Sequence, residues 1–235
     1  MTIAGLESPT PKSARRLGIR SATALLPAVG PLGIALGVAL SAFSVNRFVM
    51  WLAAPVLVAG SAQLVLFTQL DGGASVLAAA AAAIVLNARF VVYGAALAER
   101  LVVGQPRWFR WIAAHYVVDQ TYAMTLADGR VDMSPRSFRQ YFLTAGTILS
   151  LTWTASVGLG LVAGPILPSA LPVELVLAAT FVALVVPGVA GGRGVIAVLA
   201  GAGLAITQLG TSTTFVVAAV AGAVVGVARN KESAT

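Results

Sequence analysis

Three polar side chains, Gln63, Asn87 and Arg89, lie inside apolar stretches of the sequence, where they could bind a polar solute. Residues 74–98 are nearly all apolar and, at about 25 residues, are long enough to cross a bilayer. An arginine in such a helix costs about 2.5–3.5 kcal/mol on insertion scales, so it normally faces the bundle interior, a wet cavity or a partner. The alternative is that Arg89 extends along the helix to the membrane surface, and the sequence leaves both positions open.

The stretch 48–70 carries Gln63 close to two small residues, Gly60 and Ser61. A buried amide without hydrogen-bond partners costs about 2–7 kcal/mol, so Gln63 needs a partner, for which Asn87 is the natural candidate. The small residues leave room either for a neighbouring helix or for a ligand. Tyr93 falls on the same helical stripe as Arg89 and is a further candidate for this polar site.

Residues 108–127 carry a second polar cluster, made of His115, Asp119 and Gln120. His115 and Asp119 are four positions apart and share one face of a continuous helix, where the two groups could exchange protons. The segment is either an amphipathic helix at the membrane surface, where these groups are solvated, or a polar span inside the bundle. We favour the surface position for this segment.

The sequence argues against enzymatic catalysis and against a bound metal. It has no cysteine and one histidine, which excludes a thiolate nucleophile and leaves too few ligands for a zinc site built by this chain. No Ser/His/Asp order, HExxH motif or phosphate-binding loop is present in the sequence. We therefore expect no enzyme activity, no metal and no cofactor.

The composition is that of an all-α, polytopic membrane protein. Of 235 residues, 58% are hydrophobic and only 10% are charged, which is too little charge for a water-soluble surface. The 15 Lys and Arg residues give a net charge of +7, but they lie between the apolar runs, as markers of topology and contacts to lipid headgroups do, and we expect no binding of nucleic acid. We predict one transmembrane domain over residues 19–229, between cytoplasmic tails at 1–18 and 230–235.

About seven membrane segments are predicted, within a range of six to eight. They cover residues 21–45, 48–70, 74–98, 140–164, 173–190, 194–210 and 212–228. The positive-inside rule places the N-terminus and the loop around Arg136 in the cytoplasm. Two topologies are open for the first half. In one, three segments cross the membrane, the loop around Arg107 lies outside and residues 108–127 cross back. In the other, one early segment re-enters.

Glycine and proline determine how the first segment presents its backbone. Pro27, Gly30, Pro31 and Gly33 fall within two turns, which predicts a broken or kinked helix. A break would expose backbone groups near Gly30 and Gly33 to a solute, as in transporters with interrupted helices. Trp153 lies in the middle of its segment, so we expect its indole to face protein rather than lipid. Several pairs have the GxxxG spacing of close helix contacts, including Gly33 with Gly37 and Gly160 with Gly164.

Two motifs resemble the AzlC-type branched-chain amino acid transporters, the large subunit of a two-component bacterial exporter. They are Ala59-Gly60-Ser61-Ala62-Gln63 and Leu86-Asn87-Ala88-Arg89, the second followed by Tyr93. The resemblance extends from about Gly18 to Gly226. It includes the Pro- and Gly-rich first segment, Trp153 with 158–168, and the stretch 181–193 with a structural proline at Pro187. Relatives tend to carry an Asp-Glu pair where this sequence has Asp119-Gln120.

The resemblance implies export of valine, leucine and isoleucine, with methionine as a further candidate, by a secondary mechanism coupled to the proton gradient. It also implies a multi-pass location in the cell membrane and a small membrane partner of the AzlD type; a homo-oligomer is a further prediction. Gln63, Asn87, the backbone near Gly30 and Arg89 are candidates to hold the zwitterionic part of the substrate, and Asp119, His115 and Gln120 to carry protons. The competing functions are a non-transporting membrane scaffold and a passive channel for small solutes.

Overall fold

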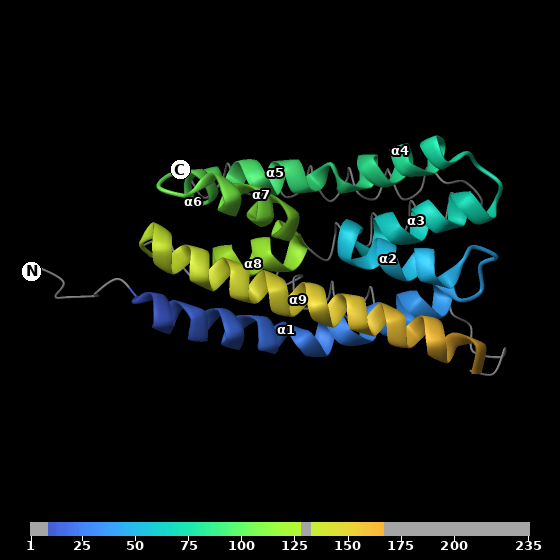
Figure 1. Cartoon of the computed structure of the whole chain (residues 1–235), viewed down its shortest axis with the longest axis horizontal. Helices are drawn as coiled ribbons and strands as arrows, with labels where there is room; N and C mark the ends of the chain where they lie inside the picture. Colours follow the sequence, from blue (N-terminus) through green and yellow to red (C-terminus); the bar gives the residue numbers. More distant parts are fainter. Residues whose placement is uncertain (1–8, 128–132, 167–235) are drawn as a thin grey trace, which may run out of the picture. The chain divides into compact units, whose positions relative to one another are not determined.

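A computed structural model describes residues 9–127 and 133–166, whose regular structure is entirely helical (Figure 1). The predicted all-α class is therefore confirmed for this part of the chain. The helices are α1 (Pro11–Leu40), α2 (Arg47–Leu57), α3 (Gly60–Asp71), α4 (Val76–Asn87), α5 (Arg89–Ala96), α6 (Ala98–Val102), α7 (Arg107–Tyr116), α8 (Asp119–Ala127) and α9 (Pro135–Ala163), and a 3₁₀ turn, Gly164–Ile166, follows. The segments predicted at 173–190, 194–210 and 212–228, Pro187 and the tail 230–235 lie outside the described residues.

Three stretches of the described chain are long and apolar enough to span a membrane. They are α1, the stretch Val76–Ala96 formed by α4 and α5, and α9 with its 3₁₀ turn. The segment predicted at 48–70 is not among them, because it is divided into two helices of 11 and 12 residues. At 1.5 Å per residue such a helix measures about 17 Å, roughly half of the 30 Å hydrocarbon core.

The predicted break in the first segment is wrong, because α1 is one continuous helix of 30 residues that contains Pro27 and Pro31. Thr10 caps its first turn, so residues 11–18, which we expected to belong to a tail, are helical. Both proline side chains are exposed, so their rings do not disturb the buried face that packs on α9. Packing along the whole of α9 thus outweighs the backbone hydrogen bonds that the prolines remove.

Glycines bring α1 and α9 into backbone contact along their length (Figure 1). A Cβ atom placed on Gly37 would lie 2.8 Å from the Cα of Gly160, and one placed on Gly164 would lie 2.7 Å from the Cβ of Ser41. Gly33 lies beneath Ser156 of α9 in the same way. The GxxxG pairs of the two helices therefore form one shared interface, because only glycine permits this approach.

Helices α2 and α3 form a hairpin that enters and leaves at one end of α9. The backbone N–H of Ser44, just before α2, donates to Asp71 at the end of α3 over 2.7 Å, so both outer ends lie together. The tip is at Val58 and Ala59, where Val58 adopts the left-handed conformation with φ 45°. Trp51 donates to the carbonyl of Thr154 over 3.2 Å and fixes the hairpin to α9. The segment 48–70 therefore folds back on itself, as the open prediction of a re-entrant early segment requires.

Helices α7 and α8 form a second hairpin, which approaches from the opposite end of α9. Gln105, before α7, donates to the carbonyl of Pro135 at the start of α9 over 2.9 Å. At the tip of the hairpin, the Tyr116 hydroxyl lies 3.2 Å from that of Thr147, twelve residues further along α9. Helix α8 returns towards the start of α9, where the Tyr141 hydroxyl donates to the carbonyl of Met124 over 3.4 Å. Residues 108–127 are therefore neither one surface helix nor one span.

Between the two hairpins the span formed by α4 and α5 has a local irregularity at Ala88, whose backbone keeps right-handed helical angles (φ −56°, ψ −25°). Helix α4 ends at Asn87 and α5 starts at Arg89, with Ala88 between them. Helix α3 packs against α4, on the half of the span near the first hairpin (Figure 1). On the other half, a side chain of α5 stacks on one of α8 in the second hairpin. The irregularity at Ala88 thus separates the half of the span that packs on the first hairpin from the half that contacts the second.

Candidate functional site

The tip of the first hairpin lies against α1 and α9. A Cβ atom on Gly60, the first residue of α3, would lie 3.0 Å from Cη2 and 3.4 Å from Cζ2 of Trp153, and 3.8 Å from Cδ2 of Leu36. Trp153 is 5% exposed, so its prediction as a protein-facing residue is confirmed. Its indole Nε1 is buried and has no hydrogen-bond partner among the described residues. Helix α3 itself begins without a side-chain cap, so its first backbone N–H groups are also unpaired by any side chain.

Gln63 lies one turn into α3 and is fully buried. Its Nε2 donates to the backbone carbonyl of Met50 in α2 over 2.8 Å, which joins the two arms of the hairpin. Its Oε1 is buried without a partner in the described chain, and the predicted bond to Asn87 is not formed. The Met50 carbonyl accepts from one of the two N–H groups of the amide, whereas the amide oxygen of Gln63 is an acceptor with no partner in the described residues. The nearby Ser61 is half-buried.

Asn87 ends α4 and lies on the far side of a small apolar contact from Gln63. Ala59 and Ala62 of the hairpin tip pack with Ala83 of α4, and Leu86 borders this contact. The Oδ1 of Asn87 is a second buried acceptor that has no partner among the residues described. The alanines bring the hairpin tip close to the end of α4, so the free acceptors of Gln63 and Asn87 belong to one region of the molecule.

Arg89 begins α5 and forms an ion pair with Asp119 of α8, with 2.9 Å between Nη2 and Oδ2. The other carboxylate oxygen, Oδ1, accepts a hydrogen bond from the Tyr93 hydroxyl over 3.0 Å. The guanidinium also lies over the ring of Phe90, 5.2 Å from its centroid. Arg89 Nε is buried and has no partner in the described part of the chain. Of the two positions left open for Arg89, the structure shows the pairing with a neighbouring helix.

Tyr122 completes the contact between α5 and α8, and it was not among the predicted site residues. Its ring stacks on that of Tyr93 with centroids 4.3 Å apart and planes inclined by 7°. The available signal was its spacing, because Tyr122 follows Asp119 by three positions and so shares its helical face. We did not assign Tyr122 to the site because we expected one continuous segment over residues 108–127, and the sequence did not show which face of that segment packs on the rest of the protein.

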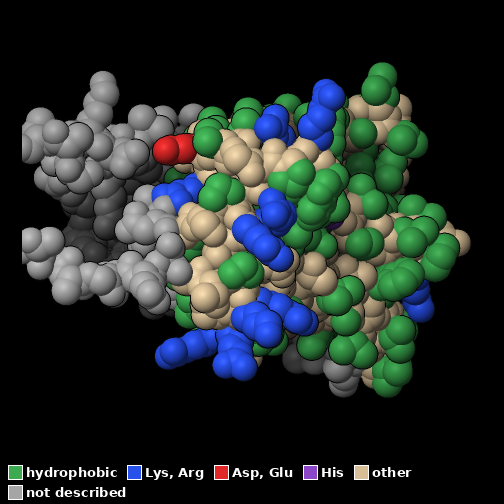
Figure 2. All heavy atoms as spheres, turned by 60° about the vertical axis from the view of Figure 1, so that its left-hand side comes forward, with side chains coloured by type: hydrophobic (Ala, Val, Ile, Leu, Met, Phe, Trp, Pro, Cys, Tyr) green, Lys and Arg blue, Asp and Glu red, His purple; other side chains and the backbone are tan. Residues whose placement is uncertain are grey.

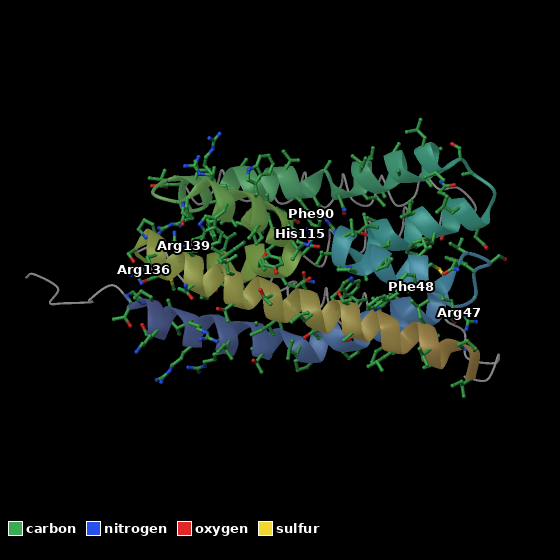
Figure 3. All side chains as sticks on the ribbon, in the orientation of Figure 1. Arg47, Phe48, Phe90, His115, Arg136 and Arg139 are labelled. Atoms are coloured by element: carbon green, nitrogen blue, oxygen red, sulfur yellow. The ribbon has the colours of Figure 1, made fainter. Side chains whose placement is uncertain are left out.

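The predicted pairing of His115 with Asp119 is wrong. His115 is an exposed residue in the last turn of α7 (Figure 3). The helix ends before Val117 and Val118, and α8 begins at Asp119. The two residues therefore do not share a helical face, and Asp119 bonds to Arg89 and Tyr93 instead. Gln120 is half-buried in the first turn of α8.

Gly30 and Gly33 do not offer the open backbone that we expected. Both lie inside the continuous α1, where their backbone groups belong to the helix. Gly33 is covered by Ser156 and Trp153, and a Cβ on Gly30 would lie 3.8 Å from the Ser156 hydroxyl oxygen. These glycines therefore support the packing of α1 on α9, while the interrupted backbone near the site is that of the hairpin tip at Val58 and Ala59.

The site thus combines two kinds of unsatisfied group. Two are acceptors and two are donors: Gln63 Oε1, Asn87 Oδ1, Arg89 Nε and Trp153 Nε1. Buried polar atoms without partners are rare in folded proteins, because each one loses its bonds to water. Free acceptors can bind an ammonium group and free donors can bind a carboxylate, so these atoms could interact with groups of either charge.

The family model described as the AzlC protein matches residues 24–167, which cover the helices of the site. The chain belongs to the AzlC family. This family is linked to branched-chain amino acid transport, and its members are transporters rather than enzymes. The resemblance inferred from the motifs around Gln63 and Asn87 is thereby confirmed. No curated protein and no solved structure matches the chain.

This AzlC-family chain carries most of its described positive charge at one end of the spans. Figure 2 shows Lys and Arg side chains gathered on this face. They come from the starts of α1 and α9 and from α6 and α7: Lys12, Arg15, Arg16, Arg20, Arg100, Arg107, Arg110, Arg136 and Arg139. At the opposite end, the described loops and turns between Ser41 and Ser75 carry Arg47 and Asp71. Family and apolar spans together indicate a membrane protein with this charge asymmetry.

Proposed function

We propose that this chain is a secondary transporter that exports branched-chain amino acids through the region between the two hairpin tips. The observation that carries the proposal is the set of buried donors and acceptors without partners in the described residues, on the half-length helix α3 and in the spans Val76–Ala96 and α9. Interrupted helices place free polar groups at the midplane of transporters, where solutes bind. The apolar residues around them, such as Leu36 and Phe67, suit an aliphatic side chain.

The polar groups divide between the two charged ends of the substrate. Gln63 Oε1 and Asn87 Oδ1 accept hydrogen bonds from the ammonium group, because both lack a donor in the described chain. Arg89 and the indole N–H of Trp153 face the carboxylate. Valine, leucine, isoleucine and methionine share this zwitterion and differ only in the apolar part, so a single polar site serves all four.

Asp119 is the proton-coupling residue of the proposed mechanism. It is the acid that contacts Arg89 within the described residues, and Tyr93 donates to its second oxygen, while Tyr122 stacks on that phenol. Protonation of Asp119 would release Arg89, so proton binding and substrate binding act on the same guanidinium. His115 and Gln120 do not contact this pair through any described bond and are weaker candidates.

The charge asymmetry supports a cytoplasmic N-terminus in the cell membrane. Cytoplasmic loops carry an excess of Lys and Arg, and the face with the starts of α1 and α9 has this excess. A small AzlD-type subunit and a homo-oligomer remain predictions. Export would then proceed from the basic end, past the hairpin tips, to the end where α3 turns into α4.

The test is efflux of labelled valine from proteoliposomes that hold the purified chain, alone and with a small AzlD-type subunit. Asn87→Leu and Gln63→Met remove the two free acceptors at similar side-chain volume and should abolish efflux while the protein remains folded. Gln69→Met, on the last turn of the same α3, is the matched control and should leave efflux unchanged.

Other outcomes would identify the competing functions. Efflux that persists after collapse of the proton gradient would indicate a passive channel. A scaffold would show no efflux and no change of melting temperature with any amino acid, although Gln63→Met would still alter its stability. Unchanged efflux in Gln63→Met and Asn87→Leu, with both variants folded, would overturn the assignment of these residues.

A further inference from the structure

Arg89 uses only half of the edge with which an arginine binds a carboxylate. The Nε–H and one Nη2–H of a guanidinium point in the same direction and together hold both oxygens of a carboxylate. Asp119 takes Nη2 with one oxygen, 2.9 Å away, while Nε is buried with no partner in the described chain. Asp119 therefore accepts one hydrogen bond from an edge of the guanidinium that can donate two.

Tyr93 explains why Asp119 does not fill the whole edge. The second oxygen of Asp119 accepts the Tyr93 hydroxyl over 3.0 Å, and the stacking of Tyr122 on the Tyr93 ring fixes that phenol. In the orientation that this bond holds, the second oxygen of Asp119 makes no hydrogen bond to Nε. A free carboxylate without such a restraint could accept from both Nε and Nη2.

We propose that Asp119 occupies half of a carboxylate subsite on Arg89, and that the carboxylate of the amino acid displaces it to bind both Nε and Nη2. This inference rests on the proposed function and names the exchange at the same site. Asp119 stays on Tyr93 when it is displaced, so no chain segment has to unfold. The substrate thereby relieves the unpartnered Nε, which the internal carboxylate leaves unsatisfied.

The exchange has a consequence for affinity, since Asp119 competes with the substrate. Asp119→Asn removes the competing charge and keeps an oxygen for the Tyr93 hydroxyl. We expect it to bind valine about tenfold more tightly than the unaltered chain, the size of one charge-assisted hydrogen bond. The chain with Asp119 intact should in turn release valine more readily.

Two analogues of valine show which end of the ligand is responsible. 3-Methylbutanoate retains the carboxylate and lacks the ammonium group, whereas 2-methylpropylamine retains the ammonium group and lacks the carboxylate. Binding is measured by calorimetry on purified, detergent-solubilised full chain. The gain in Asp119→Asn should appear with valine and 3-methylbutanoate and be absent with 2-methylpropylamine. A gain for 3-methylbutanoate no larger than that for the amine would overturn the proposal.

The variant Arg89→Lys distinguishes binding at this subsite from a general effect of charge on affinity. Arg89→Lys keeps the positive charge and loses the two-donor edge, so adding Asp119→Asn to it should give little further gain. An equal gain on either background would show long-range electrostatics instead and would refute the exchange. If Asp119→Asn does not fold, Asp119→Ser removes the same charge and retains a hydroxyl.

The failure of the exchange and of the proposed function have different signatures. If valine is transported and Asp119→Asn shows no carboxylate-specific gain, only the exchange is wrong. If neither the unaltered chain nor any variant binds or transports valine, the proposed function is wrong and the exchange falls with it.

Discussion

Gly37 of α1 and Gly160 of α9 touch through their backbones, and a Cβ atom on either would lie 2.8 Å from the Cα of the other. Carbon atoms do not approach so closely without repulsion, and both neighbours are helix backbone that cannot move aside. The contact joins two full-length spans, on which both hairpins depend for support.

Substitution of Gly160 by alanine should therefore destabilise the protein. We expect a loss of about 1–3 kcal/mol, the usual cost of overpacking a tight interface. Gly94→Ala is the matched control, because a Cβ there meets no atom within 4 Å and alanine favours a helix by about 0.5–1 kcal/mol. The measurement is the melting temperature in detergent; an unchanged value for Gly160→Ala would contradict the backbone contact.

The re-entrant hairpin of α2 and α3 is tested by single cysteines, since the chain has none of its own. Ser44→Cys and Ala74→Cys lie before and after the hairpin and should react with an impermeant maleimide from the same side of the membrane. Val103→Cys and Gln140→Cys, at the other end of the spans, should react only from the opposite side. Labelling of positions 44 and 74 from opposite sides would mean that residues 48–70 cross.

The buried side chain of Gln105 should contribute strongly to stability. It donates to the carbonyls of Arg100 and Pro135 over 3.2 and 2.9 Å and accepts from Arg139 over 2.9 Å. Its loss in Gln105→Ala leaves these groups unpaired, at a cost of about 2–4 kcal/mol. The exposed Gln140 on α9 offers the comparison, because Gln140→Ala should change the melting temperature little. Similar shifts for both variants would argue against this network.

Trp153→Phe should separate packing from polar recognition. Phenylalanine keeps an aromatic ring between Gly33 and Gly60 and removes the buried N–H, which has no partner in the described residues. We expect a folded protein with reduced valine efflux. Trp111→Phe, at an 80% exposed position of α7, should transport normally. Normal efflux in Trp153→Phe would exclude Nε1 from the substrate site.

The sequence predicted the helical class, the family and the polar residues of the site, because hydrocarbon length and rare polar residues are local properties. It did not predict which helices are interrupted. Pro27 and Pro31 indicated a break in α1, but packing on α9 maintains that helix, whereas the break at Val58 carries a left-handed valine that no propensity would select. Tertiary contacts decide both cases.

The sequence also could not predict the hydrogen-bond partners of the polar residues. Gln63 bonds to a backbone carbonyl of its own hairpin, and no side-chain pattern can predict that acceptor. Asp119 was assigned to His115 because four positions separate them, which holds only for an unbroken helix. The turn at Val117 moves Asp119 to Arg89, thirty positions earlier in the chain.

Two hairpins of half length from opposite ends divide the thickness of the membrane between them. For a chain that transports a solute as proposed, each hairpin would then obstruct the path from one side only. A displacement of α2 and α3 would open it on one side while α7 and α8 keep it closed on the other, and α1 would not have to move against α9.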